Sequence, residues 1–127
     1  MAIPFKRLFV RNTMEQTYTI FILVRATKAW LLLSHEERAA YAQGEFASCL
    51  APFPTVTLRY FDAEAFTSQC SDVFMFSASS LPDYCAVMDR IRDSRLLTEP
   101  YFEFLETIMS VEDTYRGMAE KQLKVGS

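Results

Sequence analysis

Apolar residues follow two different spacings along the chain, and these spacings predict where strands and helices form. Four segments are apolar and β-branched, or alternate apolar with polar residues, which is typical of strands. They are residues 18–25, 56–61, 72–77 and 101–109. The first, Tyr18 to Arg25, is apolar nearly throughout, which indicates a central strand covered on both sides.

Two segments between these strands carry helix signals. Ser34 and Glu37 have the spacing of a capping box, so a helix is predicted to begin there and to end before Pro52. Ser80 and Asp83 have the capping distance that marks a second helix start. The residues expected to be buried are Ala39, Ala42, Phe46, Cys49 and Leu50 in the first helix and Tyr84, Val87, Met88 and Ile91 in the second.

The predicted order of elements is β-α-β-β-α-β, which is the ferredoxin-like or split βαβ arrangement. Such a fold is α+β, with a four-stranded antiparallel sheet that carries both helices on one face. The other face of the sheet is left uncovered. We therefore expect a ligand site or a partner-binding surface on that face.

Side chains alternate between the two faces of a strand, so each predicted strand divides into two sets. The aliphatic set is expected under the helices and comprises Ile20, Ile22, Val24, Val56, Leu58, Tyr60, Val73, Met75, Leu105 and Met109. The opposite set comprises Phe21, Leu23, Arg25, Thr57, Arg59, Phe61, Asp72, Phe74, Phe76, Phe102, Phe104 and Glu106. This second set is too aromatic to be left in water.

A second copy of the same sheet is the commonest cover for such a face, because two-fold symmetry makes each patch its own complement. Burial of each phenylalanine would contribute roughly 1.5–3 kcal/mol. Charges inside the contact would need partners, and Arg25 and Arg59 balance Asp72 and Glu106 in number. We therefore expect a homodimer joined through the aromatic face.

The composition limits the classes of binding partner and the cellular compartment that we expect for the protein. The chain has 127 residues, enough for one domain, and a net charge of −3, so nucleic acid is not expected as a partner. Its three cysteines show no C-x-x-C spacing, which favours free thiols in a reducing cytoplasm over disulfides or a zinc site. No apolar run approaches the roughly 20 residues needed to cross a membrane. No metal or other cofactor is predicted.

Arg59 and Asp72 are the residues most suited to catalysis on the predicted aromatic face. An arginine in a dry, aromatic-walled pocket could hold a carboxylate or an enolate, and Asp72 could orient the substrate or accept a proton. The same pair could instead be a structural ion pair that fixes the register of the sheet or the geometry of the dimer.

The remaining residues of the predicted cavity or dimer face are aromatic or charged. Trp30, the only tryptophan, could close the cavity against water, or it could fasten the first helix to the sheet. The other predicted lining residues are Phe21, Arg25, Phe61, Phe74, Phe76, Phe104 and Glu106.

Several short motifs resemble the darcynin family of small bacterial proteins of uncharacterised function. They are Thr19-Ile20-Phe21-Ile22-Leu23-Val24-Arg25, Trp30-Leu31-x-Leu33-Ser34-x-Glu36-Glu37-Arg38, Leu58-Arg59-Tyr60-Phe61-Asp62-Ala63-Glu64-Ala65-Phe66 and Ser71-Asp72-Val73. The resemblance covers residues 18–115, which predicts a flexible extension over 1–17 and a tail over 116–127. The layout is also similar to the dimeric α+β barrel proteins, which include cofactor-free oxygenases, isomerases, dehydratases and haem enzymes.

Two functions are consistent with these observations. The first is a homodimeric binding or structural protein of the darcynin type. The second is a cofactor-free enzyme, of the monooxygenase, isomerase or dehydratase type, that acts on a small aromatic or polyketide-like carbonyl compound. A cavity large enough for a ligand, roughly 300 Å³ or more, would be required by an enzyme.

Overall fold

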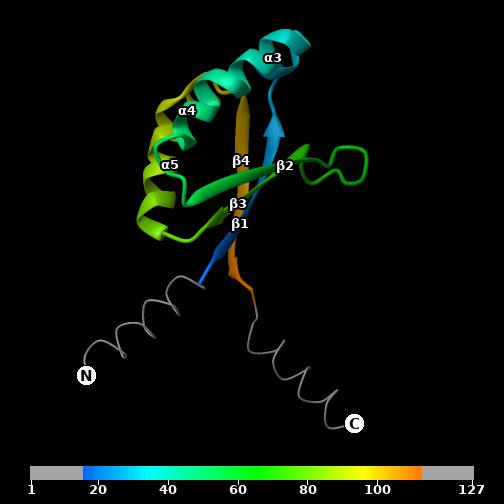
Figure 1. Ribbon diagram of the computed structural model, residues 1–127. Helices are drawn as coiled ribbons and strands as arrows, with labels where there is room; N and C mark the ends of the chain where they lie inside the picture. The colour runs from blue at the N-terminus through cyan, green and yellow to red at the C-terminus, as the bar shows by residue number, and fades with distance from the viewer. Residues whose placement is uncertain (1–15, 113–127) are drawn as a thin grey trace, which may run out of the picture.

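A four-stranded antiparallel sheet forms the centre of the computed structural model, which describes residues 16–112 (Figure 1). The strands are β1 (Tyr18–Ala26), β2 (Val56–Asp62), β3 (Asp72–Ala78) and β4 (Phe102–Val111). Their order in the sheet is β2-β3-β1-β4, with every neighbouring pair antiparallel. This is the predicted ferredoxin-like topology. The predicted extension over 1–17 and tail over 116–127 fall almost wholly outside the described residues.

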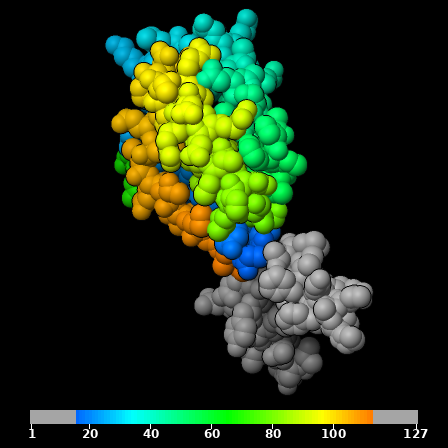
Figure 2. All heavy atoms as spheres, turned by 90° about the vertical axis from the view of Figure 1, so that its left-hand side faces the viewer, coloured from blue at the N-terminus to red at the C-terminus, as the bar shows by residue number. Residues whose placement is uncertain are grey.

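The helices lie on one face of this sheet. They are α2 (Lys28–Leu31), α3 (His35–Tyr41), the π-helix η1 (Ala42–Phe46), α4 (Ala47–Leu50), α5 (Leu81–Asp93) and α6 (Arg95–Thr98). Figure 2 views the helix side, where the segment from α3 to α4 and the helix α5 run side by side over the sheet. The opposite face of the sheet carries no helix among the described residues (Figure 1).

Both predicted helix starts are confirmed. The Ser34 hydroxyl accepts the Glu37 backbone N–H at 3.1 Å, and the Glu37 carboxylate accepts the Ser34 N–H at 2.8 Å. The Ser80 hydroxyl accepts the Asp83 N–H at 3.2 Å. These bonds satisfy donors that a helix start leaves without a partner inside the helix.

We call the run from α3 through η1 to α4 the first helical segment. Its buried side differs from the stripe of buried residues that was predicted. Tyr41 and Phe46 are buried and their rings stack with centroids 6.2 Å apart. In a regular α-helix, two residues five positions apart would point about 140° away from each other around the axis. The wider π-helical turn η1 brings both rings to the inner side. Ala39 and Ala42, predicted to be buried, are exposed.

The predicted assignment of β3 to the two faces is wrong. Ile22, which is fully buried, pairs with Phe74, and Ile20 pairs with Phe76, so these phenylalanines lie under the helices. Val73 and Met75 therefore lie on the opposite face. The alternation within β1, β2 and β3 was predicted correctly, but the sequence of one strand does not show which of its two sets faces inward.

The predicted faces of β4 also need correction. A bulge opposite Leu23 and Val24 lets Glu106 pair with Leu23 and Phe104 pair with Val24, so Leu105 is the additional residue. Phe104 and Phe102 thus lie on the helix side. The irregularity shifts the period of two within the strand, and no turn residue in the strand marks it.

Rings from both layers meet at Phe74. Its centroid lies 5.7 Å from Phe46, 5.5 Å from Phe102 and 5.4 Å from Tyr60. Aromatic pairs at these separations add to the stability that burial alone provides. This cluster connects the first helical segment to β2, β3 and β4.

Replacement of Phe74 by alanine is expected to lower the free energy of unfolding by about 3–5 kcal/mol, because the ring is fully buried. Phe66→Ala is the matched control, since that ring is 88% exposed and its loss should change stability little. Chemical denaturation followed by circular dichroism measures both. Similar losses for the two variants would contradict the assignment of Phe74 to the core.

Candidate functional site

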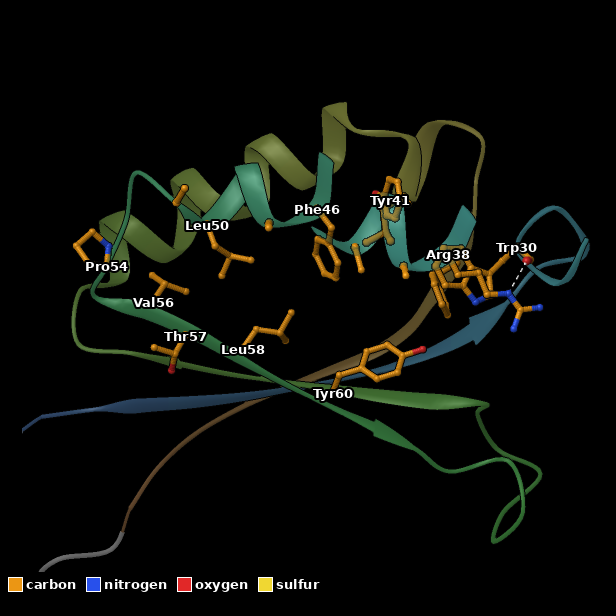
Figure 3. Close-up of a pocket in the computed structure, with 16 residues that line it drawn as sticks. Trp30, Arg38, Tyr41, Phe46, Leu50, Pro54, Val56, Thr57, Leu58 and Tyr60 are labelled. Carbon is orange, nitrogen blue, oxygen red and sulfur yellow. Dashed lines mark hydrogen bonds between the residues drawn. The ribbon is translucent and has the colours of Figure 1, made fainter. Parts of the chain in front are cut away.

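An open cleft of about 730 Å³ lies between the first helical segment and β2 (Figure 3). Phe46 and Leu50 point into it from the helical segment, and Leu58 and Tyr60 point into it from the strand. Trp30 and Arg38 lie at one end and Pro54 at the other. The remaining lining residues are Ala39, Tyr41, Ala42, Ala47, Ala51, Val56, Thr57, Leu96 and Phe102.

Small side chains account for the hollow. The helical segment presents alanines at positions 39, 42, 47 and 51, where larger residues would fill the space above β2. β2 is an edge strand, and the segment from α3 to α4 lies over it. The cleft is therefore apolar along its length and open to solvent.

Trp30 joins three elements at one end of the cleft. Its ring lies 5.9 Å from Tyr41 in α3, 5.4 Å from Tyr101 and 5.0 Å from Phe102 in β4. It also lines the cleft. Of the two predicted roles of Trp30, the one that fastens the first helix to the sheet agrees with these contacts.

Arg38 is the cationic residue of the cleft lining. Its Nε donates to the carbonyl of Trp30 at 3.2 Å and its Nη2 donates to the carbonyl of Leu31 at 3.1 Å. The guanidinium carbon lies 5.7 Å from the centre of the Trp30 ring, within the range of cation–π contacts. These contacts hold the guanidinium in one place at the end of the cleft.

Tyr60 and Asp72 place polar groups near the same end. Burial and the Asp72 carboxylate raise the pKa of Tyr60 above its usual range, whereas the positive charge of Arg38 acts in the opposite direction. Asp72 is 9% exposed and its Oδ2 accepts the Ser71 hydroxyl at 2.8 Å. A phenol with a raised pKa stays neutral at pH 7, so Tyr60 can donate or accept a hydrogen bond but is not a phenolate base.

No metal centre is formed by the part of the chain that the structure describes, because no three of its His, Cys, Asp or Glu side chains lie together. The helices within residues 16–112 also include none that is long and apolar enough to cross a membrane. The described part of the cleft offers apolar contact, the Arg38 guanidinium, the phenols of Tyr41 and Tyr60, the Thr57 hydroxyl and the Trp30 indole.

Comparison with known proteins adds the family. A family model described as "Darcynin, domain of unknown function" matches residues 5–123. The chain belongs to the darcynin family. The darcynin of Chromobacterium violaceum is 53% identical over 66 residues, which are 52% of this chain and 84% of that protein. Darcynin 1 of Acinetobacter baumannii is 41% identical over 85 residues, 67% of this chain and 94% of that protein.

The solved structures that this darcynin resembles share its fold at low identity. A chlorite dismutase from Candidatus Nitrospira defluvii in complex with imidazole matches with a TM-score of 0.63 and 15% identity. The match covers 82% of this chain and 44% of that chain. The darcynin thus spans less than half of the chlorite dismutase chain, and the likeness concerns the fold alone.

The structure of the darcynin does not bring the predicted catalytic pair together. Arg59 pairs with Met75 and lies on the uncovered face, where its guanidinium carbon is 5.1 Å from the centre of the Phe61 ring. Asp72 lies on the helix side with Phe74. The assumption that both residues share one face was wrong, because the inward set of β3 was assigned incorrectly.

The other predicted site residues divide between the two faces. Phe21, Arg25, Phe61 and Glu106 lie on the uncovered face, where the Arg25 Nη2 donates to the Gln69 carbonyl at 3.0 Å. Phe74, Phe76 and Phe104 belong to the helix side and are corrected accordingly. Only Trp30 of the predicted cavity residues lines the cleft.

The sequence interpretation missed Arg38 and Tyr60 as cleft residues. Arg38 was noted only as the last residue of a darcynin-like motif, and no role in a site was predicted for it. The available signal was the excess of alanines from position 39 to 51, which indicates a helix surface with room beside it. Tyr60 was placed correctly on the helix side, but a cavity there was not expected.

Tyr41 provides a test of the buried end of the site. Burial raises the pKa of Tyr41 to about 12 from 10.0, and its hydroxyl lies 3.3 Å from Ser94 Oγ. Because the folded state holds the phenol protonated, this stabilisation is complete below pH 10 and is lost as the pH rises towards 12. Between pH 10 and pH 12 the free energy of unfolding of the wild type should therefore fall by roughly 2 kcal/mol more than that of Tyr41→Phe, which has no phenol to ionise. Denaturant unfolding at each pH measures the difference, and equal losses would contradict it.

Proposed function

We propose that this darcynin binds an apolar small molecule in the cleft between the first helical segment and β2. The observation that carries the proposal is the cleft itself, at about 730 Å³ and lined almost entirely by apolar side chains. This volume lies within the range of roughly 300–1,000 Å³ that is usual for small-molecule sites. A few polar groups gathered at one end, Arg38 and the Tyr60 hydroxyl, could orient the ligand.

The exposure of Tyr60 supports the same proposal. Tyr60 is 49% exposed although it extends from the floor of the cleft. A ligand between Leu58 and Leu50 would remove apolar surface from water, which contributes about 25 cal/mol per Å². Burial of this apolar surface therefore makes the free energy of ligand binding more favourable.

A cofactor-free enzyme is the second candidate, and the observation in its favour is that, besides burial, the Asp72 carboxylate lies close enough to raise the pKa of Tyr60. Asp72 could accept a proton, and Tyr60 could donate a hydrogen bond to a carbonyl oxygen. Arg59 has no part in this version, because it lies on the other face of the sheet. Binding is the better-supported function, since Asp72 is nearly buried and already accepts a hydrogen bond from Ser71.

The cleft can be tested with the only tryptophan of the chain, because Trp30 lines it. Addition of dodecanol should change the Trp30 fluorescence and saturate. Ala47→Phe fills the cleft and should weaken binding at least tenfold, whereas Gln43→Phe adds the same side chain at an exposed position of the same helical segment that is not part of the lining. Equal binding by both variants, or no saturable signal in the wild type, would contradict the proposed site.

We propose further that the uncovered face joins two copies of the chain. Adjacent residues across this face form the rows Arg59, Met75, Phe21, Ile108 and Phe61, Val73, Leu23, Glu106. Within this apolar surface, Phe61 is 38% and Ile108 is 47% exposed. Sheet-on-sheet association would cover these side chains.

We also propose a cytoplasmic location for the protein, which the three free cysteines support.

Charge favours one arrangement of the two copies. The β2 edge of the face carries Arg59, whereas the β4 edge carries Glu103 and Glu106. A two-fold axis parallel to the strands reverses their order, so β2 of one copy faces β4 of the other. Arg59 of one copy would then face the row next to the one that contains Glu106 of the other copy. The two-fold axis repeats this pairing at the opposite edge of the contact.

Arg59→Glu is therefore expected to weaken the dimer at least tenfold, and the double variant Arg59→Glu with Glu106→Arg should restore it, because the pairing of opposite charges returns. Light scattering after size-exclusion chromatography measures the dimer fraction over a range of concentrations. Arg92→Glu is the control, since it reverses a charge on the outer side of α5. A monomeric wild type, or a double variant as weak as the single one, would contradict this arrangement.

A further inference from the structure

The two ends of the cleft differ in polarity. Leu50, Pro54 and Val56 form an apolar end, whereas Arg38 lies at the other end (Figure 3). The ring of Tyr60 lies along the floor with its hydroxyl directed towards the Arg38 end. A ligand that fits this cleft along its length would accordingly have one apolar end and one polar end.

The Arg38 guanidinium is built as a fixed cation. Its Nε and Nη2 donate to two backbone carbonyls of α2, those of Trp30 and Leu31, and its plane is held beside the Trp30 ring. A guanidinium restrained in this way loses little further freedom when it binds an anion. The Nη1 group makes no hydrogen bond to any residue within 16–112, so it is available to a ligand.

Arg38 also differs from the arginines whose charge is neutralised inside the fold. Arg95 forms an ion pair with Glu45 at 2.8 Å, and Arg92 forms one with Asp89 at 3.5 Å. No carboxylate of the described residues lies within ion-pair distance of Arg38. The cleft thus contains a cation whose charge is not paired by residues 16–112.

Besides burial, two carboxylates, Asp72 and Asp62, act on the Tyr60 hydroxyl and raise its pKa. Asp72 is 9% exposed and is held by the Ser71 hydroxyl.

We propose that the ligand is an amphipathic carboxylate, with its carboxylate on Arg38 and its hydrocarbon chain over Leu58 towards Pro54. The inference rests on the proposed function, because it names the class of molecule that would occupy the cleft. From Val56 to Tyr60 the strand under the chain extends about 13 Å, which suits a medium-length alkyl chain. Two or more charge-assisted hydrogen bonds would fix the head, and apolar contacts would hold the chain.

Three ligands with the same chain and different heads test this assignment: dodecanoate, dodecanol and dodecyltrimethylammonium. Titrations of the full-length protein, followed by Trp30 fluorescence and by calorimetry below the micellar concentration, give the affinities. Dodecanoate should bind about ten- to a hundredfold more tightly than dodecanol, which corresponds to the strength of charge-assisted hydrogen bonds. Dodecyltrimethylammonium should bind more weakly than either.

Variants of Arg38 separate the head contact from the chain contact. Arg38→Gln should remove the preference for dodecanoate and leave the affinity for dodecanol within about threefold, because the apolar lining is unchanged. Arg38→Lys should keep part of the preference, since it retains the charge but not the paired donors. Arg92→Gln, which removes the same charge from the outer side of α5, should keep the full preference.

The outcomes distinguish the two levels of the proposal. If no ligand binds, the cleft is not a small-molecule site and the proposed function fails. If dodecanol binds as tightly as dodecanoate, or the cationic ligand binds best, the cleft is a site but the carboxylate assignment is overturned. A preference for dodecanoate that survives in Arg38→Gln would also overturn it, and this comparison needs only that the variant binds dodecanol as the wild type does.

Discussion

The ring of Phe74 is the contact on which the rest of the structure depends. It comes from an inner strand of the sheet, and it touches Phe46 from the helical segment and Phe102 and Phe104 from β4. Because aromatic rings are bulky, they keep the helical backbone at a distance from the sheet. Over β3 and β1 the inward side chains are fully buried, whereas over β2 Leu58 is half-buried and Tyr60 is exposed. The cleft is therefore the part of the helix–sheet space that the aromatic core leaves empty.

The π-helix η1 decides how the helical segment meets this core. It turns Tyr41 and Phe46 to the same side, and it leaves Glu45 to accept the Arg95 backbone N–H at 2.6 Å and its Nε at 2.8 Å. The contact with Arg95 lowers the pKa of Glu45, which keeps its carboxylate charged. The first helical segment is thereby fixed to α6 at its outer side and to the aromatic core at its inner side. The walls of the cleft are held in place before any ligand binds.

Much of the fold could be predicted from the sequence because its signals are local. Strand lengths, helix starts at Ser34 and Ser80 and the β-α-β-β-α-β order all follow from spacing and capping chemistry, and the structure confirms them. Two features were beyond local reasoning. The inward face of β3 depends on which of its residues pair with Ile20 and Ile22, and the face of β4 depends on a bulge opposite Leu23. Aliphatic residues were assigned to the helix side because they form one of the two alternating sets, whereas in β3 the phenylalanines are the set that packs under the helices.

The same errors explain why the candidate site was predicted in the wrong place. Arg59 and Asp72 are three-dimensional neighbours only if their strands present the expected faces, and a reversal of one strand separates them. The cleft could not be found from polar motifs, because the residues that create it are those whose side chains are small. Arg38 belongs to a motif that resembles the darcynin family, but the motif does not indicate a ligand site, and the position of Arg38 becomes informative only when its contacts with Trp30 and Leu31 are known.

Strand β2 has a consequence for how this protein could be engineered or could diverge. Leu58 and Tyr60 face the helical segment, whereas Arg59 and Phe61 face the opposite side of the sheet. Because successive residues of a strand alternate strictly, a substitution at an even position of this stretch alters one surface and a substitution at an odd position alters the other. One short segment thus encodes two surfaces in an interleaved order. The two could be redesigned separately, residue by residue, without a change in the length of any loop.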